Sequence, residues 1–141
     1  MFTGSEREQV DFERDTFAGV PVPQGIRSLM GQLSIRELMS VIATAQVVVS
    51  GSTGPAHLAA ALRVPIVTLS DPLRSHLPVR WKPLGRGVLL RPDVPTCERC
   101  IGEICPYWDC LDRFTAPEVS YRVAQVIQAS QIPSSLQIIH I

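Results

Sequence analysis

The sequence predicts an α/β fold in which a doubly wound parallel sheet is flanked by helices. Two observations predict it. Apolar runs of strand length alternate with helical patterns along the chain. In addition, Val47–Val49 and Ile66–Leu69 bracket an alanine-rich stretch, which is typical of a right-handed βαβ unit with parallel strands. The chain has 141 residues, enough for one domain with a hydrophobic core.

The first part of the chain is predicted to contain two helices, each opened by a capping box. In this motif a Ser before the helix and a Glu three residues later satisfy each other's backbone amides. Ser5 and Glu8 open a charged helix that should extend to about Phe17. Ser34 and Glu37 open a second helix, whose apolar residues follow at helical spacing. We also expect a strand stub at 2–4, a loop at 19–25 and a short strand at 26–29.

The centre of the chain is predicted to be strand, tight turn, helix and strand. Val47–Val49 is an apolar β-branched run that indicates a strand buried on both faces. Pro55 suits the first turn of a helix, and Thr53 or Gly54 can cap it. That helix should end near Arg63, because the proline at 65 disfavours helical backbone before it.

The rest of the chain should contribute a loop, a last strand and a helix. Three prolines within 70–84 favour an ordered loop without regular structure. Gly87–Leu90 is predicted to be the last strand, and a third capping box, Thr115 to Glu118, opens a helix. The apolar face of that helix should consist of Val119, Val123, Val126 and Ile127. Residues 136–141 are apolar but receive no element.

The turn Ser52–Gly54 is a candidate anion site. Ligands of such units lie at the carboxyl ends of the strands, where free amides and the positive end of the helix dipole favour phosphate. His57 in the first helical turn supports a functional role, since a purely structural helix would gain more from an acidic residue there. The alternative is a capped crossover helix that binds nothing.

All four cysteines fall in one short segment: Cys97, Cys100, Cys105 and Cys110. A pair separated by two residues can reach one tetrahedral ion, so the cluster suggests a structural zinc site. The second half of the cluster is spaced more widely than in a typical zinc ribbon. The alternative is a set of free thiols that pack a compact loop. In either case the cluster is interpreted as structural.

Composition excludes several classes of protein. The formal net charge is zero, which argues against electrostatic binding of nucleic acid. No apolar run approaches the roughly 20 residues that span a bilayer, and there is no signal peptide. We therefore expect a cytoplasmic protein, in which disulfides are rare.

Three segments carry a resemblance to a known family. Thr53-Gly54-Pro55-Ala56-His57-Leu58-Ala59-Ala60-Ala61 resembles the Asp-Thr-Gly-Pro-Met-His-Leu-Ala-Ala-Ala signature of the family nine glycosyltransferases, the bacterial heptosyltransferases. Arg80-Trp81-Lys82-Pro83-Leu84-Gly85 is similar to the family's Arg-Trp-Gly-Pro-Tyr-Gly, and the cysteine segment follows in the right order. The resemblance covers roughly residues 2 to 128.

The resemblance implies a Rossmann-like domain, the C-terminal half of a GT-B glycosyltransferase. Residues 1–130 would be part of the donor-binding domain, with the cysteine-rich loop at 97–110, and residues 131–141 a tail. The implied reaction transfers heptose from ADP-heptose to the lipopolysaccharide inner core, with inversion and without a metal in the chemistry. The donor would contact Ser52, Thr53, Gly54, Pro55 and His57.

Two parts of the family pattern are missing, which suggests a fragment: the acceptor domain, and the front part of the donor domain, where the family has a His-Pro-Gly-Ser segment. The sequence also departs from the pattern in residues that would contact the donor. Ser52 stands where the family has Asp, and Leu69-Ser70-Asp71-Pro72 where it has Phe-Gly-Pro-Thr. The family's catalytic base lies in an acceptor domain absent from this sequence, so no catalytic residue is assigned here. We expect an isolated chain that is inactive, at the inner face of the inner membrane if it meets its acceptor. The alternative is a non-catalytic nucleotide-binding or interaction module derived from the same fold.

Overall fold

A computed structural model describes residues 1–15, 24–129 and 136–141. These residues divide into two compact units, Met1–Val41 and Ile42–Ile141. The sheet and the predicted anion site belong to the second unit.

Both capping boxes of the first unit are confirmed. They open α1 (Glu6–Asp15) and α2 (Ile35–Ala43). In the first, the Ser5 amide donates to the Glu8 carboxylate at 2.7 Å, and the Glu8 amide donates to the Ser5 hydroxyl at 3.2 Å. In the second, the Ser34 amide donates to Glu37 at 2.8 Å. The helix starts are therefore set by local sequence alone.

The two short strands predicted in this unit do pair with each other, but neither forms a full strand. The structure has a single bridge between Phe2 and Ser28, flanked by hydrogen bonds such as Phe2 N–H to Arg27 O at 2.8 Å. A further hydrogen bond from the Gly31 amide to Gly4 O at 2.9 Å continues this contact up to Ser5, where the chain turns to cap α1. The predicted end of α1 at Phe17 and most of the loop at 19–25 lie outside the described residues.

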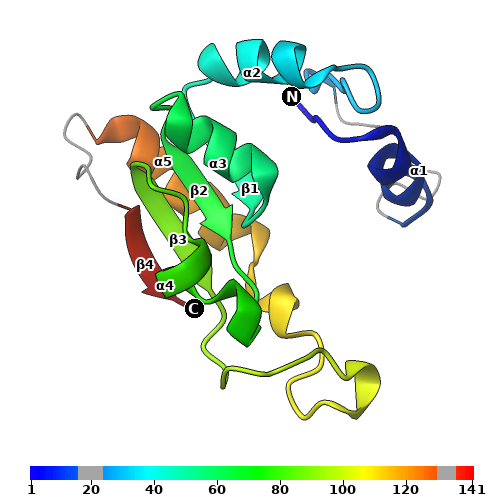
Figure 1. Ribbon diagram of the computed structural model, residues 1–141, viewed down its shortest axis with the longest axis vertical. Helices are drawn as coiled ribbons and strands as arrows, with labels where there is room; N and C mark the ends of the chain where they lie inside the picture. The colour runs from blue at the N-terminus through cyan, green and yellow to red at the C-terminus, as the bar shows by residue number, and fades with distance from the viewer. Residues whose placement is uncertain (16–23, 130–135) are drawn as a thin grey trace. The chain divides into compact units, whose positions relative to one another are not determined.

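The second unit is built on a four-stranded parallel sheet with the order β1-β2-β3-β4 (Figure 1). Its strands are β1 (Val48–Gly51), β2 (Ile66–Leu69), β3 (Gly87–Arg91) and β4 (Leu136–His140). In register, Val48 pairs with Ile66 and Ile66 with Gly87. This confirms the predicted parallel pair at the centre of the chain and the α/β class.

Two strand predictions need correction. β1 is not buried on both faces: it is an edge strand that alternates between half-buried and exposed residues, and Val49 is 46% exposed. Gly87–Leu90 is not the last strand, because β4 pairs with β3 along its length. The residues expected to form a tail thus contribute a strand. β4 pairs with β3, which is distant in the sequence, so the local sequence pattern did not predict a strand at 136–140.

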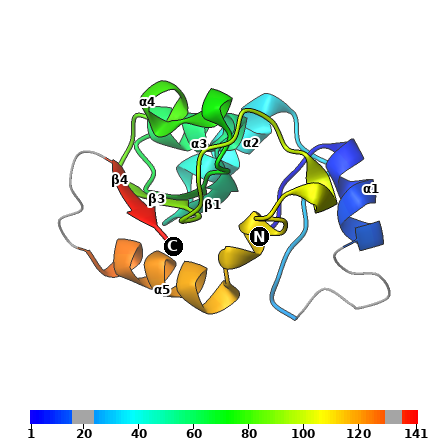
Figure 2. The same ribbon diagram turned by 90° about the horizontal axis from the view of Figure 1, so that it is seen from below.

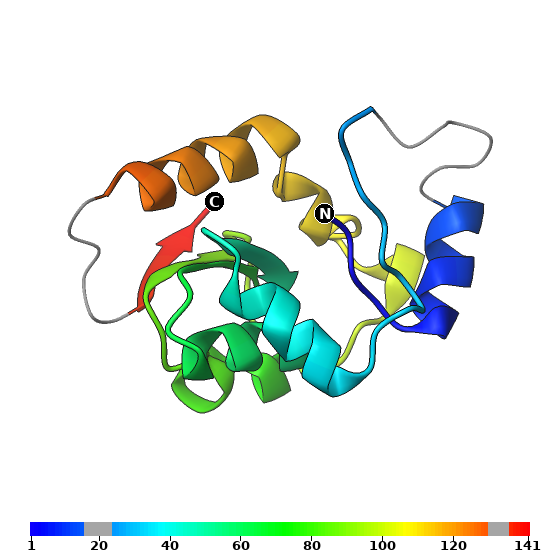
Figure 3. The ribbon, with the colours of Figure 1, turned by 90° about the horizontal axis from the view of Figure 1, so that it is seen from above.

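Helices cover the two faces of the sheet. Figures 2 and 3 show α3 (Gly54–Ala61) on one face and α5 (Ala116–Gln128) on the other. On α3, Ala56 and Ala59 are fully buried, because small side chains let the helix lie close to the strands. On α5, Val126 packs against the core of β2 and β3, whereas Ile127, predicted to share that face, is 48% exposed.

Both ends of the crossover helix follow from local sequence. At its start Thr53 is the N-cap residue in extended conformation, and Pro55 lies in the first turn. At its end the Val64 amide donates to Ala59 O at 2.9 Å and the Arg63 amide to Ala60 O at 3.1 Å. With Arg63 left-handed (φ 60°), this is a Schellman motif, so the predicted end near Arg63 is confirmed.

The segment 70–84, predicted to be an irregular loop, contains two short elements. A 3₁₀ turn spans Arg74–His76 and α4 spans Pro78–Trp81. Proline was interpreted as a breaker, but Pro78 occupies the first helical turn, where a missing N–H costs nothing. Two more 3₁₀ turns, Gly102–Ile104 and Cys110–Arg113, lie in the cysteine segment.

The third capping box forms only in part. The Glu118 amide donates to the Thr115 hydroxyl at 3.4 Å. The Glu118 carboxylate instead accepts from Arg122 at 2.8 Å, one turn further along α5. An ion pair within the helix therefore replaces the reciprocal half of the predicted box.

Candidate functional site

The candidate site lies at the carboxyl edge of the sheet, in the turn between β1 and α3. Gly51 ends β1 and Gly54 begins α3, so only Ser52 and Thr53 connect the two elements. The segments that follow β2 and β3 leave the sheet at this same edge, because the strands are parallel. Crevices at such edges are where ligands of open α/β sheets bind.

The backbone of the turn has fewer free amides than the sequence predicted. The Ser52 amide donates to Leu69 O and the Thr53 amide donates to Gly51 O, both at 2.8 Å. The amides of Ala56 and His57 both donate to the Thr53 carbonyl. Among the described residues, this leaves the Gly54 N–H as the unpaired amide of the turn, because Pro55 has none. Thr53 itself makes no side-chain cap.

Gly54 is also open in space. A β-carbon added at Gly54 would meet no atom within 4 Å. The unpaired N–H therefore belongs to an exposed position that another molecule can approach, at the positive end of the α3 dipole.

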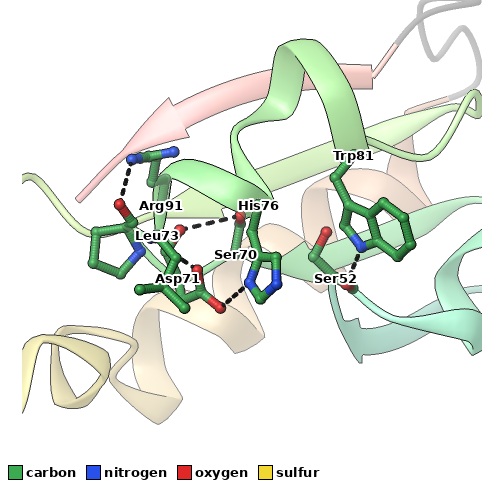
Figure 4. A network of polar contacts seen from close by, with 8 residues as sticks. Ser52, Ser70, Asp71, Leu73, His76, Trp81 and Arg91 are labelled. Carbon is green, nitrogen blue, oxygen red and sulfur yellow. Dashed lines mark hydrogen bonds and ion pairs between the residues drawn. The ribbon is translucent and has the colours of Figure 1, made fainter. Parts of the chain in front are cut away.

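Trp81 fastens the turn from the neighbouring segment (Figure 4). Its indole N–H donates to Ser52 O at 2.7 Å. Its ring meets the ring of His57 edge to face, with centroids 5.2 Å apart and planes at 76°. Sequence reasoning placed Trp81 only within a resemblance segment and assigned it no contact. Its role in the turn depends on a contact between distant segments, which no local pattern contains.

Two buried polar atoms in the turn have no hydrogen-bond partner among the residues that the structure describes. They are the Ser52 hydroxyl and Nε2 of His57. Buried polar groups in folded proteins are nearly always bonded, so each exception needs an explanation. Both residues belong to the predicted donor-binding set, and both lie within three residues of the Gly54 amide. We interpret the turn as a place where a bound polar molecule would form the missing hydrogen bonds.

The segment after β2 is held by Asp71. One carboxylate oxygen accepts the Leu73 amide at 2.9 Å, and the other lies 2.7 Å from Nδ1 of His76 (Figure 4). Ser70, just before it, is buried, and its amide donates to Leu90 O at 2.9 Å. Asp71 therefore orders the loop that leads to α4 and Trp81.

Arg91 ends β3 and joins the two loops beside it. Its side chain is 4% exposed, and Nη2 donates to Pro72 O at 3.2 Å and to the Thr96 hydroxyl at 3.0 Å. Its Nη1 has no partner in the part of the chain that the structure describes. Burial of a cation is unfavourable unless its charge is compensated. In this structure the two hydrogen bonds from Nη2 connect both loops to the end of β3.

The four cysteines line one cavity of about 410 Å³ beside the Asp71 loop. Burial, and then the neighbouring Cys97, Cys100 and Cys105 thiols, raise the pKa of the Cys110 thiol. In the described ranges, however, no three Cys, His, Asp or Glu side chains are already placed to hold a metal ion. The structure therefore gathers the predicted ligands around one space without bringing them into coordination distance, and the zinc site stays a prediction.

None of the described helices is both long enough and apolar enough to cross a bilayer.

Comparison with known proteins gives one match. The family model described as glycosyltransferase family 9 (heptosyltransferase) matches residues 1–99, which include β1, α3, β2, α4 and β3. No curated protein and no solved structure is significantly similar to the chain. The matched range covers well over half of the sequence, contains the whole Ser52–His57 turn and ends within the cysteine segment. The chain therefore belongs to glycosyltransferase family 9 and is a glycosyltransferase by resemblance.

Proposed function

We propose that this chain holds the nucleotide-sugar donor in the transfer of heptose from ADP-heptose to the inner core of lipopolysaccharide. Family membership supplies the reaction class. The observation that carries the donor site is the pair of unpartnered buried atoms, the Ser52 hydroxyl and His57 Nε2, in the turn that starts α3. The same turn offers the unpaired Gly54 amide.

The turn would act on the diphosphate of the donor. When the bond between sugar and diphosphate breaks, negative charge builds on the leaving phosphate oxygens. The Gly54 N–H and the α3 dipole would stabilise that charge from fixed positions, so no reorganisation is needed at the moment of reaction. His57 would donate to a phosphate oxygen or a sugar hydroxyl. This arrangement does not call for a metal ion.

His57 can act in this way only through a ring nitrogen that carries a hydrogen. Nε2 must carry the proton to donate it, and in the structure this atom is buried beside the edge-to-face contact with Trp81. The Trp81 ring would therefore shift or share the site when a ligand enters. The indole hydrogen bond to Ser52 O gives Trp81 a positioning role in the turn.

The acceptor side is not supplied by the residues assigned here. The family's base is expected in an acceptor domain, so deprotonation of the acceptor hydroxyl is assigned to no residue of this chain. A lipopolysaccharide acceptor is held in a membrane by its lipid, which would place the reaction at a membrane surface.

Nucleotide selectivity tests the proposal. In calorimetric titrations of the full chain, ADP should bind more tightly than UDP or GDP, and ADP-heptose at least as tightly as ADP. His57→Ala should weaken binding of ADP, whereas His140→Ala, on the exposed edge strand β4, should not. Equal binding of all three diphosphates, or equal losses in both histidine variants, would contradict the assignment.

Gly54 provides a second variant that does not disturb folding. Because the space beside Gly54 is empty, Gly54→Val should leave the thermal midpoint of the chain nearly unchanged. It should nevertheless abolish ADP binding by blocking the approach of phosphate to the amide. Full binding by a folded Gly54→Val variant would mean that the diphosphate lies elsewhere.

A further inference from the structure

The cysteine segment is a long connection that lacks a core of its own. It runs from the end of β3 at Arg91 to the start of α5 at Ala116, and its regular structure is two 3₁₀ turns. Its large apolar side chains stay exposed, with Ile104 at 81%, Trp108 at 49% and Leu111 at 50%. Connections of this length inside compact domains are uncommon. Where burial is insufficient, a disulfide or a metal commonly holds such a segment.

One end of the segment is fixed to the segment that follows β2. The Cys97 amide donates to Pro72 O at 3.1 Å, and the Cys97 carbonyl accepts from the Arg74 amide at 2.8 Å. An ion pair between Arg74 and Glu98 lies beside this bridge at 2.5 Å. Cys97 is therefore held in place by backbone bonds and presents a thiol from a defined position.

The remaining cysteines turn back toward Cys97. Gly102 and Asp109 both adopt left-handed backbone (φ 64° and 62°) and reverse the chain between successive cysteines. As a result all four cysteines line the same cavity, although they span fourteen residues of sequence. For Asp109, which is not a glycine, this conformation carries a steric cost.

The Cys105 sulfur already accepts a backbone hydrogen bond. The Tyr107 amide, two residues further on, donates to Cys105 Sγ at 3.4 Å. This contact fixes the direction in which the Cys105 sulfur points within the loop. Arg99 lines the same cavity and supplies positive charge beside the cluster.

We propose that Cys97, Cys100, Cys105 and Cys110 bind one Zn²⁺ that fixes this segment against the β2 loop. Each thiol gives its proton to solvent, so four thiolates and Zn²⁺ form a centre of net charge −2, next to Arg99. Because no three of these side chains are yet in coordination distance, binding must contract the loop around the cavity until each sulfur lies about 2.3 Å from the ion. The proposal is independent of the donor site.

Metal content of the full chain tests the proposal. Protein purified and refolded with zinc should carry one Zn²⁺ per chain, and Co²⁺ in its place should give the absorption bands of tetrahedral thiolate coordination. Cys100→Ser removes the exposed ligand and should lower zinc affinity more than about a hundredfold, beyond the effect of losing an outer partner. Asp112→Asn, in the same loop, is the matched control and should keep full affinity.

Several results would overturn the proposal. Four thiols that react with a thiol reagent at the same rate with and without zinc would do so, as would disulfides in place of free thiols. Zinc bound equally by Cys100→Ser and wild type would place the metal elsewhere. If Cys100→Ser misfolds, removal of zinc from the wild type by a chelator still decides the matter. It should lower the thermal midpoint, and an unchanged midpoint would contradict the proposal.

Discussion

At the residue scale, a single glycine determines how closely two strands of the sheet can approach each other. Gly87 opens β3 at φ 128°, a conformation that favours glycine. A β-carbon there would lie 1.9 Å from Ile66 O on the neighbouring strand. The two strands can pair in this register only because residue 87 has no side chain.

Gly87→Ala should therefore destabilise the fold strongly. Neither the backbone oxygen of Ile66 nor the strand can move without breaking the ladder, so we expect a loss of about 3 kcal/mol, the upper end of the usual cost of overpacking. Chemical unfolding followed by circular dichroism measures it. Gly54→Ala is the control, because its β-carbon meets no atom within 4 Å. Equal stability of the two variants would refute the close approach at Gly87.

The capping box of α2 should appear as a titration. Hydrogen bonds from the Ser34 hydroxyl and then from its amide lower the pKa of Glu37 below its ordinary 4.5. Because the pKa is lower folded than unfolded, the contribution to stability is present above the unfolded pKa and is lost as pH falls through the folded one. In an NMR titration, Ser34→Ala should raise the pKa of Glu37 toward 4.5.

Ser40→Ala is the matched control for that titration. The Ser40 hydroxyl donates to Arg36 O on the same helix and does not contact the Glu37 carboxylate. The pKa of Glu37 should stay low in this variant. A Glu37 that titrates identically in the Ser34 and Ser40 variants would show that the box does not form.

At the scale of elements, the crossover helix α3 shows how both ends of one helix are set. Pro55 and Thr53 define its start, and the Schellman motif around Arg63 defines its end. Arg63 adopts left-handed backbone although it is not a glycine. Its backbone carbonyl accepts a hydrogen bond from the Arg86 side chain at 3.3 Å. The helix end is thus formed at a steric cost.

Arg63→Gly should remove that cost. Relief of left-handed strain is worth about 1 kcal/mol, so the variant should unfold at a higher denaturant midpoint than the wild type. Arg63→Ala keeps the β-carbon and should be close to neutral, and Arg63→Val should destabilise. If glycine were no more stable than alanine here, the assigned C-terminal motif would be wrong.

Whole-molecule organisation brings three segments to one edge of the sheet. The turn after β1, the segment with α4 after β2 and the cysteine segment after β3 all leave from carboxyl ends. Trp81 bonds the second segment to the first, and Arg91 bonds the second to the third. The candidate site is therefore a product of contacts between loops as much as of the turn itself.

How much of this the sequence could predict depends on the range of the interaction. Local rules gave the starts of α1, α2 and α3, because a cap or a proline acts within a few residues. They failed for β4, whose pairing with β3 joins distant segments. They also failed for Pro78, where the same residue type can end or begin a helix.

The candidate site divides along the same line. The Ser52–His57 turn was identified from its residue types and its resemblance to a family signature. In the structure, however, the Ser52 and Thr53 amides are not free donors, because they donate hydrogen bonds to Leu69 O and Gly51 O. It added Trp81, whose contacts with Ser52 and His57 are long-range. Hydrogen-bond occupancy is a property of the folded chain and has no local sequence pattern.

The measurement that tests the donor site most directly is the effect of ADP on backbone amide shifts in the full chain. Each charge-assisted hydrogen bond to diphosphate is worth roughly 1.5–3 kcal/mol, but Thr53 and Gly54 are exposed to water, which offsets much of the gain. We predict a dissociation constant on the order of millimolar, about −4 kcal/mol, with the largest shifts at Thr53, Gly54 and His57. Shifts centred on Arg122 or on the cysteine segment, or no shifts at all, would contradict the account.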